Sequence, residues 1–138
     1  MAQRILSGRQ TGNRGFTLIE LMIVMAIVTI LVGMAVPIYQ KSILRAKESV
    51  LRNNLFTMRT QIDEFTYDKQ KAPQTLQEMV TEGYLRSVPV DPITGSADTW
   101  KIIMEDASTT ASQSQPGIFD VRSGSPKTSL EGTPYAEW

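Results

Sequence analysis

Carboxylates are the chemically most capable side chains of this sequence, because the chain contains no histidine and no cysteine. It therefore has no usual nucleophile–base pair and no Cys/His metal site. Two acidic groups remain that could serve as acid and base, namely Asp63, Glu64 and Asp68, and the pair Glu105 and Asp106. Acidic residues on helix surfaces and at strand ends are usually just solvated, and no glycine-rich phosphate loop accompanies them. We predict that the chain is not an enzyme.

Another carboxylate, Glu20, occupies a place where a charge is costly. It directly precedes Leu21–Tyr39, 19 residues without a charge, which as a helix would span about 28 Å, close to the thickness of a hydrocarbon core. A charged side chain in hydrocarbon costs about 2.5–3.5 kcal/mol even on the lenient insertion scale. The run contains no Lys or Arg. Either Glu20 finds a partner outside its own helix, or it lies at the headgroup level, where its cost is small.

The residues before Glu20 are basic, since Arg4, Arg9 and Arg14 face no acid within residues 1–15. A plain single-pass anchor and a cleaved secretory signal are the simplest interpretations of such a start. A secretory signal has an apolar core of about 7–15 residues followed by its cleavage site. Here the apolar run is longer and the likelier junction, Gly15-Phe16, comes before it. Over the whole chain Lys+Arg and Asp+Glu are equal at 14 each, so we expect no nucleic-acid partner.

The stretch "RGFTLIELMIVMAIVTIL" (residues 14–31) resembles the prepilin signature shared by type IV pilins and type II secretion pseudopilins. Its elements are a short basic leader, a Gly-Phe junction, a glutamate four residues later and an apolar helix. The resemblance implies that a prepilin peptidase cleaves after Gly15 and methylates the new amine of Phe16. It also implies a homopolymer that is held in membrane lipid before assembly and that works with other pseudopilins and an inner-membrane assembly platform.

The resemblance implies a charged partner for Glu20. Cleavage creates an amine at Phe16, which reaches Glu20 of a staggered neighbour more easily than that of its own helix, so Glu20 would set the register between subunits. A buried carboxylate is tolerated only with such a partner. Gly33 and Pro37 weaken the helix late in the apolar run. The resemblance implies that the segment between them can unwind when subunits pack, whereas in a lone anchor both residues are simply tolerated.

Beyond the apolar run a helical stripe continues to about Lys69, at steps of four and three residues. Its members are Leu44, Glu48, Leu51, Leu55, Met58, Ile62 and Phe65, all apolar except Glu48. This pattern predicts an amphipathic helix with a compact domain packed against one side. A long coiled coil is the alternative, but the repeat is short for one.

The remainder of the chain predicts one short helix and a small sheet. "KAPQTLQEMVTEGYL" suits a helix opened near Pro73 and closed at Gly83, with Leu76, Met79 and Val80 inward. Thr99–Glu105 suits a strand with Trp100, Ile102 and Met104 on one face, "IFDVRS" (residues 118–123) a second strand, and residues 106–117 a polar loop. The predicted fold class is α+β and type IV pilin-like, a long N-terminal helix packed on a small antiparallel sheet with one short extra helix.

Three segments follow from these patterns: a cleaved leader (1–15), a transmembrane and assembly helix (16–40) and an exported globular domain (41–138). A basic cluster opens the third segment, namely Lys41, Arg45, Lys47 and Arg52. It suits a rim near anionic headgroups or, alternatively, a patch for a partner. Basic residues flank the apolar run on both sides, so charge alone does not orient it. The resemblance implies an inner-membrane protein with a cytoplasmic leader and a periplasmic domain.

The C-terminal part, "GYLRSVPVDPITG", "GIFDVRSGS" and "YAEW", is similar to the major pseudopilins of type II secretion (general secretion pathway protein G). In that family an Asp-bearing loop after the last strand binds calcium. Here residues 122–127 carry no carboxylate, and calcium prefers six to eight oxygen ligands. Asp120 and Glu131, with hydroxyl and carbonyl oxygens, would be the ligands of a weak site; no other cofactor is expected.

Three functions remain open from the sequence. The first is a structural subunit of a type II secretion pseudopilus, which polymerises to help drive folded proteins across the outer membrane. The second is a type IV pilin of an extracellular fibre for adhesion, twitching or DNA uptake. The third is a membrane-tethered binding domain that never polymerises. The Gly15–Glu20 motif argues against the third, and the absence of a C-terminal disulfide favours the first over the second.

Overall fold

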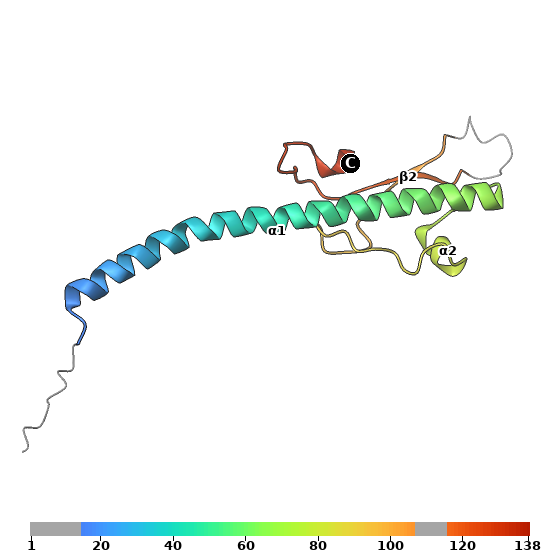
Figure 1. The fold of residues 1–138 in the computed structure, drawn as a ribbon. Helices are drawn as coiled ribbons and strands as arrows, with labels where there is room; N and C mark the ends of the chain where they lie inside the picture. The colour runs from blue at the N-terminus through green and yellow to red at the C-terminus, as the bar shows by residue number, and fades with distance from the viewer. Residues whose placement is uncertain (1–14, 107–115) are drawn as a thin grey trace, which may run out of the picture. The chain divides into compact units, whose positions relative to one another are not determined.

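The protein is described from a computed structural model that covers residues 15–106 and 116–138 (Figure 1). The elements follow in the order α1 (Leu18–Lys69), α2 (Leu76–Thr81), β1 (Lys101–Met104), β2 (Ile118–Arg122) and a 3₁₀ turn, η1 (Tyr135–Glu137). The predicted leader, apart from Gly15, and most of the predicted loop over residues 106–117 lie outside the described residues. The chain divides into two compact units, Met1–Ile38 and Tyr39–Trp138.

In the first unit, α1 opens on a threonine cap. The Thr17 hydroxyl accepts the backbone N–H of Glu20 at 3.2 Å, and the Thr17 carbonyl accepts that of Leu21 at 3.2 Å. Such a cap satisfies backbone donors that the first turn of a helix leaves without partners. The apolar side chains that follow are exposed on every side of the helix. Within the described residues, α1 alone is long and apolar enough to cross a membrane, judged by length and composition.

The second unit is built on the apolar stripe of α1. The buried residues of this helix are those predicted from the sequence spacing: Glu48, Leu51, Leu55, Met58, Ile62 and Phe65. They share one hydrophobic core with Met79, Leu85, Trp100, Ile118, Val121 and Tyr135. In the view of Figure 1, α2 and the C-terminal residues flank the second half of α1 on opposite sides. The predicted α+β, pilin-like fold is confirmed.

The short helix α2 also matches its prediction. Its N-cap, Thr75, accepts the backbone N–H of Glu78 at 3.0 Å, and the Glu78 carboxylate accepts the backbone N–H of Gln74 at 2.7 Å. This arrangement resembles a capping box, except that Glu78 accepts the N–H of the residue before the N-cap. The helix ends before Gly83, whose φ of +86° is easy only for glycine. Met79 is buried completely, while Leu76 and Val80 are partly buried against the core.

The sheet is a two-stranded antiparallel ladder in which Ile102 pairs with Val121, Ile103 with Asp120 and Met104 with Ile118. A register irregularity between Ile103 and Met104 leaves Phe119 unpaired and brings Ile118 and Val121 onto the buried side. The expected inward face of the first strand is therefore only partly right. Trp100 is buried, but Ile102 and Met104 are 37% and 44% exposed. Met104 lines a surface hollow with Ile103 and Phe119 because the bulge breaks the two-residue alternation.

Candidate assembly site at the start of α1

The residues predicted to act in processing and assembly lie at the beginning of the described chain. Phe16 is 88% exposed, and with Glu20, Leu21 and Val24 it lines a surface hollow of about 530 Å³. Gly15 precedes the helix, and a Cβ added there would meet no atom within 4 Å. The peptide bond between Gly15 and Phe16 thus lies in a non-helical segment ahead of the capped turn, and its cleavage remains a prediction.

Glu20 has no side-chain partner among residues 15–106 and 116–138. The cap at Thr17 engages only its backbone N–H. The carboxylate therefore projects from the first turn of a helix whose other side chains here are apolar. Its charge is compatible with the positive end of the helix dipole, but that effect is worth only about 0.3–1 kcal/mol. An ammonium group brought from outside this helix would fit the site.

Gly33 and Pro37 lie within α1, which is helical throughout this segment. Proline has no N–H, so Pro37 leaves the carbonyl of the residue four positions earlier without its helical donor. That residue is Gly33, whose missing side chain leaves open space around it. The pair therefore marks one weak turn of the helix. Unwinding of this turn on assembly remains a prediction.

The two predicted calcium ligands each face a cationic side chain. Asp120 accepts a hydrogen bond from Arg59 Nε at 2.7 Å and lies 3.6 Å from Arg122 Nε. Glu131 lies 3.9 Å from Arg52. The described residues contain no group of three or more His, Cys, Asp or Glu side chains that could hold a metal ion. Both carboxylates are thus engaged by guanidinium groups in this structure. Calcium binding remains a prediction.

A buried carboxylate that sequence reasoning did not treat as a site fastens the C-terminal segment to α1. Glu48 is 4% exposed, and its Oε1 accepts the backbone N–H of Leu130 and the hydroxyl of Tyr135, both at 2.8 Å. Burial and then the hydrogen bond to Glu48 raise the pKa of Tyr135 to about 12. The sequence feature that could have indicated this role is that Glu48 is the single charged residue in an otherwise apolar helical stripe.

A second buried carboxylate, Asp91, closes a turn over residues 91–96. Its Oδ1 accepts the backbone N–H groups of Ile93 and Thr94, and its Oδ2 accepts the hydroxyl of Ser123 at 2.6 Å. The neighbouring Gly124 passes so close to Thr99 that a side chain there would collide with the Thr99 carbonyl. Both buried carboxylates are therefore structural and hold distant segments together.

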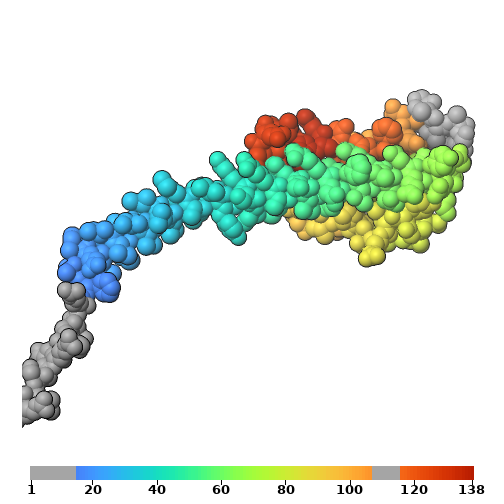
Figure 2. Space-filling model, in the orientation of Figure 1, coloured from blue at the N-terminus to red at the C-terminus, as the bar shows by residue number. Residues whose placement is uncertain are grey.

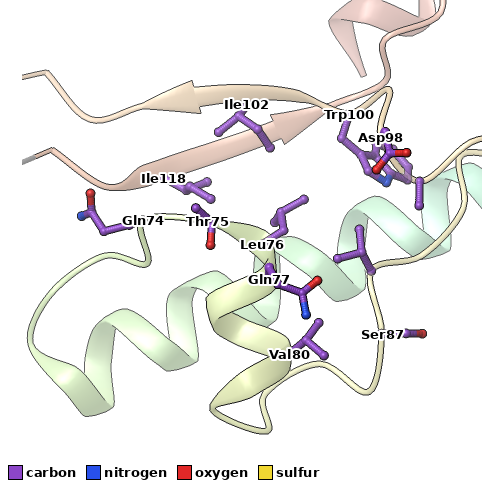
Figure 3. A pocket seen from close by; sticks show the side chains of 12 residues that line it. Gln74, Thr75, Leu76, Gln77, Val80, Ser87, Asp98, Trp100, Ile102 and Ile118 are labelled. Carbon is purple, nitrogen blue, oxygen red and sulfur yellow. The ribbon is translucent and has the colours of Figure 1, made fainter.

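Figure 3 shows a groove of about 540 Å³ between α2 and the sheet. Leu76 and Val80 of α2, with Trp100, Ile102 and Ile118, form its apolar part. The indole N–H of Trp100 is already bound by the Pro89 carbonyl at 2.7 Å. Within the described residues the groove holds no cluster of titratable groups, so it has the chemistry of a contact surface.

Comparison with known proteins supports the motif. The model of the "Prokaryotic N-terminal methylation motif" family matches residues 11–36. The type IV major fimbrial protein FimA of Dichelobacter nodosus is 46% identical over 62 residues, 45% of this chain and 39% of that protein. The type IV major pilin protein PilA of Myxococcus xanthus is 46% identical over 59 residues, 43% of this chain and 27% of that protein.

A longer but weaker similarity involves the type II secretion system core protein G of Klebsiella michiganensis. It is 28% identical over 100 residues, covering 61% of this chain and 70% of that protein. By contrast, this chain spans less than two fifths of the length of the fimbrial and pilin relatives described above. No solved structure gives a significant match.

The chain thus carries the N-terminal methylation motif of type IV pilin-like proteins, on a pilin-like α+β fold, and its relatives include both type IV pilins and a type II secretion protein G. Pilin-like proteins are structural subunits that polymerise into filaments after processing by prepilin peptidase. The motif and the apolar start of α1 together indicate a membrane-anchored, single-pass protein.

Proposed function

We propose that this protein is the structural subunit of a type II secretion pseudopilus, which polymerises to help drive folded proteins across the outer membrane. The main support for the proposal is the fraction of each relative that the similarity covers. The match to core protein G covers 70% of that protein, whereas the matches to FimA and PilA cover 39% and 27% of those proteins. The C-terminal segment supports it, since hydrogen bonds to Glu48 hold that segment in a chain without cysteine.

Assembly in this proposal depends on the start of α1. Prepilin peptidase cleaves after Gly15 and methylates the amine of Phe16, and this amine pairs with Glu20 of a staggered neighbour. A carboxylate and an ammonium group that leave water together cost far less than either charge alone. The leader lies in the cytoplasm and the globular unit in the periplasm, where the subunit meets other pseudopilins above an inner-membrane assembly platform.

A second candidate function is a type IV pilin of an extracellular fibre for adhesion, twitching or DNA uptake. The 46% identity to FimA favours it. That similarity extends over 62 residues, 45% of this chain, and the methylation motif, common to pilins and pseudopilins, occupies residues 11–36. A tethered domain that never polymerises would give Glu20 no partner, so we place it third.

Deleting the gene and restoring it on a plasmid separates these functions. If the protein forms a pseudopilus, exported hydrolases should accumulate in the periplasm of the deletion strain, while surface fibres and twitching stay normal. Restoring the gene should return the hydrolases to the medium. Loss of fibres or twitching with normal secretion would instead assign the protein to a type IV pilus.

Processing offers a test at the level of the molecule. Intact-mass spectrometry of protein from native membranes should find a chain that begins at Phe16 with a methylated amine. A bulky residue at position 15 should block cleavage by crowding the peptidase site, while Gly15→Ala should be cleaved. A side chain at position 15 would meet no atom of the described chain within 4 Å, so a loss of cleavage would reflect contact with the peptidase. A mature protein that retains residues 1–15 would contradict the proposal.

A further inference from the structure

Charge is segregated along the exposed part of α1 that belongs to the second unit. The first four turns carry Lys41, Arg45, Lys47 and Arg52, and the last two carry Asp63, Glu64 and Asp68. The other basic residues of this part, Arg59 and Lys69, pair with Asp120 and Glu82 of the same domain. The only acidic residue between Lys41 and Asp63 is Glu48, which is buried. A helix stabilised by its own ion pairs would instead alternate the two signs at four-residue spacing.

The chain leaves the ends of this charge pattern unpaired. The ion pairs within residues 15–106 and 116–138 do not involve Lys41, Arg45, Asp63 or Glu64. Glu64 accepts only a hydrogen bond from the Gln61 amide. Lys41 and Arg45 are four residues apart, a spacing at which like charges destabilise a helix. Within the described residues, Lys41, Arg45, Asp63 and Glu64 therefore form no ion pair that would stabilise the isolated domain.

The spacing of these residues determines which of them share a side of α1. Arg45 and Asp63 are 18 residues apart, which is five turns, so they lie on one side of α1 about 27 Å from each other. Glu64 follows Asp63 and is about 100° further around the helix. Phe56 and Tyr67, on the side of Arg45, are 70% and 79% exposed. Figure 2 shows this part of α1 uncovered between the C-terminal residues and the segment around α2.

We propose that α1 binds a second, parallel copy of this chain through these charges, with Lys41 and Arg45 of one copy against Asp63 and Glu64 of the next. The inference rests on the proposed function, because copies inserted in one membrane by the same apolar run must be parallel. Since the basic and acidic groups are far apart on one chain, each contact leaves a free basic end and a free acidic end. Such a heterologous contact extends into a filament.

The proposed displacement distinguishes this contact from the one at Glu20. Arg45 and Asp63 meet when two copies are displaced by about 27 Å, whereas Glu20 and the amine of Phe16, four residues apart, meet at about 6 Å. One neighbour cannot satisfy both displacements. The α1 contact therefore joins a subunit to a different neighbour from the one that binds Glu20, and the two contacts can be tested separately.

Anionic lipid headgroups are the competing partner for Lys41 and Arg45, because these residues follow the apolar run closely. A membrane surface would bind the basic residues without using Asp63 or Glu64. Reversing the acidic charge should then have no consequence, and it should not rescue a reversed basic charge. A second copy predicts the opposite on both counts.

The decisive experiment exchanges the charges in the full-length protein in cells. Arg45→Glu and Glu64→Arg should each lower the yield of sheared filaments roughly three- to tenfold, the range expected for an interfacial ion pair, and the double variant should restore it. Lys47→Glu is the matched control, because Lys47 is exposed and lies about 200° around the helix from Arg45. It should leave the yield unchanged. Single effects without rescue, or no effect of either reversal, would overturn the inference.

Disulfide trapping supplies a second measurement, since the chain has no cysteine of its own. Arg45→Cys with Glu64→Cys should give a ladder of cross-linked oligomers in membranes. The two cysteines of one chain are about 28 Å apart along α1 and cannot bridge, because a disulfide needs Cα atoms within about 7 Å. Lys47→Cys with Glu64→Cys should give no ladder. Filaments and secretion without an Arg45–Glu64 ladder would refute this contact alone, whereas a wild-type protein that forms no filaments would refute the proposed function.

Discussion

Two glutamates on one helix, Glu20 and Glu48, interrupt apolar stretches in different ways. Glu48 is 4% exposed, and a hydroxyl and a backbone N–H bind its Oε1. Glu20 is exposed, and within residues 15–106 and 116–138 its carboxylate has no partner. The first glutamate is satisfied by its own chain, which folds residues 130 and 135 back onto α1. In our proposal the second is satisfied by a neighbouring subunit.

This difference separates a carboxylate that stabilises a fold from one that we propose favours assembly. Leaving a buried polar group without a partner costs about 1–3 kcal/mol, and more for a charge. In the second unit that cost is avoided as soon as the domain folds. At the start of α1, in the proposed assembly, it would be avoided by the amine of a neighbouring subunit, so the same physical penalty would favour the assembled state.

The largest effect on folding should come from charging the core side of α1. Leu55→Asp or Ile62→Asp places a carboxylate among residues that are 2% exposed. We expect each to destabilise the domain by several kcal/mol and to leave it unfolded. The measurement is thermal or urea unfolding of residues 41–138, which should form a soluble monomer because the exposed apolar run ends before them.

Phe56→Asp is the matched control for this prediction, because Phe56 adjoins Leu55 in the sequence but is 70% exposed. It should change the free energy of unfolding by about 0.5 kcal/mol or less. If Leu55→Asp and Ile62→Asp were tolerated as well as Phe56→Asp, the packing of α1 on this core would be wrong.

A smaller effect should follow from removing Glu48. Glu48→Ala leaves the Tyr135 hydroxyl and the Leu130 N–H without an acceptor, and we expect a loss of about 2–3 kcal/mol in the free energy of unfolding. Glu48→Gln keeps an acceptor oxygen and should lose less. Glu64→Ala, an exposed glutamate on the same helix, should be nearly neutral. Equal stability of the Glu48 and Glu64 alanine variants would remove the distinction between a satisfied and an exposed carboxylate.

Alkaline pH should weaken the contact between Tyr135 and Glu48, with a smaller loss in the free energy of unfolding than Glu48→Ala causes. The pKa of Tyr135 is raised to about 12 in the folded protein, against about 10 in the unfolded chain. Because the folded state favours the neutral phenol, this contribution is complete below pH 10 and is lost as the pH rises from 10 to 12. The slope should be at most about 1.4 kcal/mol per pH unit. Tyr135→Phe should remove that slope in unfolding curves measured at each pH.

The sequence predicted those parts of the fold that depend on local spacing. The stripe from Glu48 to Phe65 follows from helical periodicity, and α2 was predicted from Pro73 and Gly83, although its cap is Thr75. The first strand was less predictable. Its pattern suggested that Ile102 and Met104 were inward, but the bulge at Phe119 depends on how β2 packs, which alternation alone does not encode.

Partners distant in sequence were beyond prediction. Glu48 was recognised as an exception in its stripe, yet its donors are 82 and 87 residues away. Asp120 was assigned as a calcium ligand because the resembled family binds calcium after its last strand, and only the fold brings Arg59 to it from 61 residues away. Glu20 was predictable as an anomaly for a simpler reason: its surroundings are fixed by the neighbouring residues of one helix.

The smallest effect on stability should belong to Glu20, although its effect on assembly should be large. Glu20→Val removes a charge without a partner in the described chain, so the free energy of unfolding of the globular unit should not change. Membrane insertion should be equal or better, by up to a few kcal/mol. The variant should be cleaved and membrane-bound yet scarce in sheared filaments, because the pair with the neighbour's Phe16 amine is lost. Glu20→Asp keeps the charge with a shorter reach and should be intermediate. Normal filament yield and normal secretion from Glu20→Val cells would place Glu20 at the headgroup level, and the contrast with Glu48 would then reflect only the difference between an exposed and a buried residue.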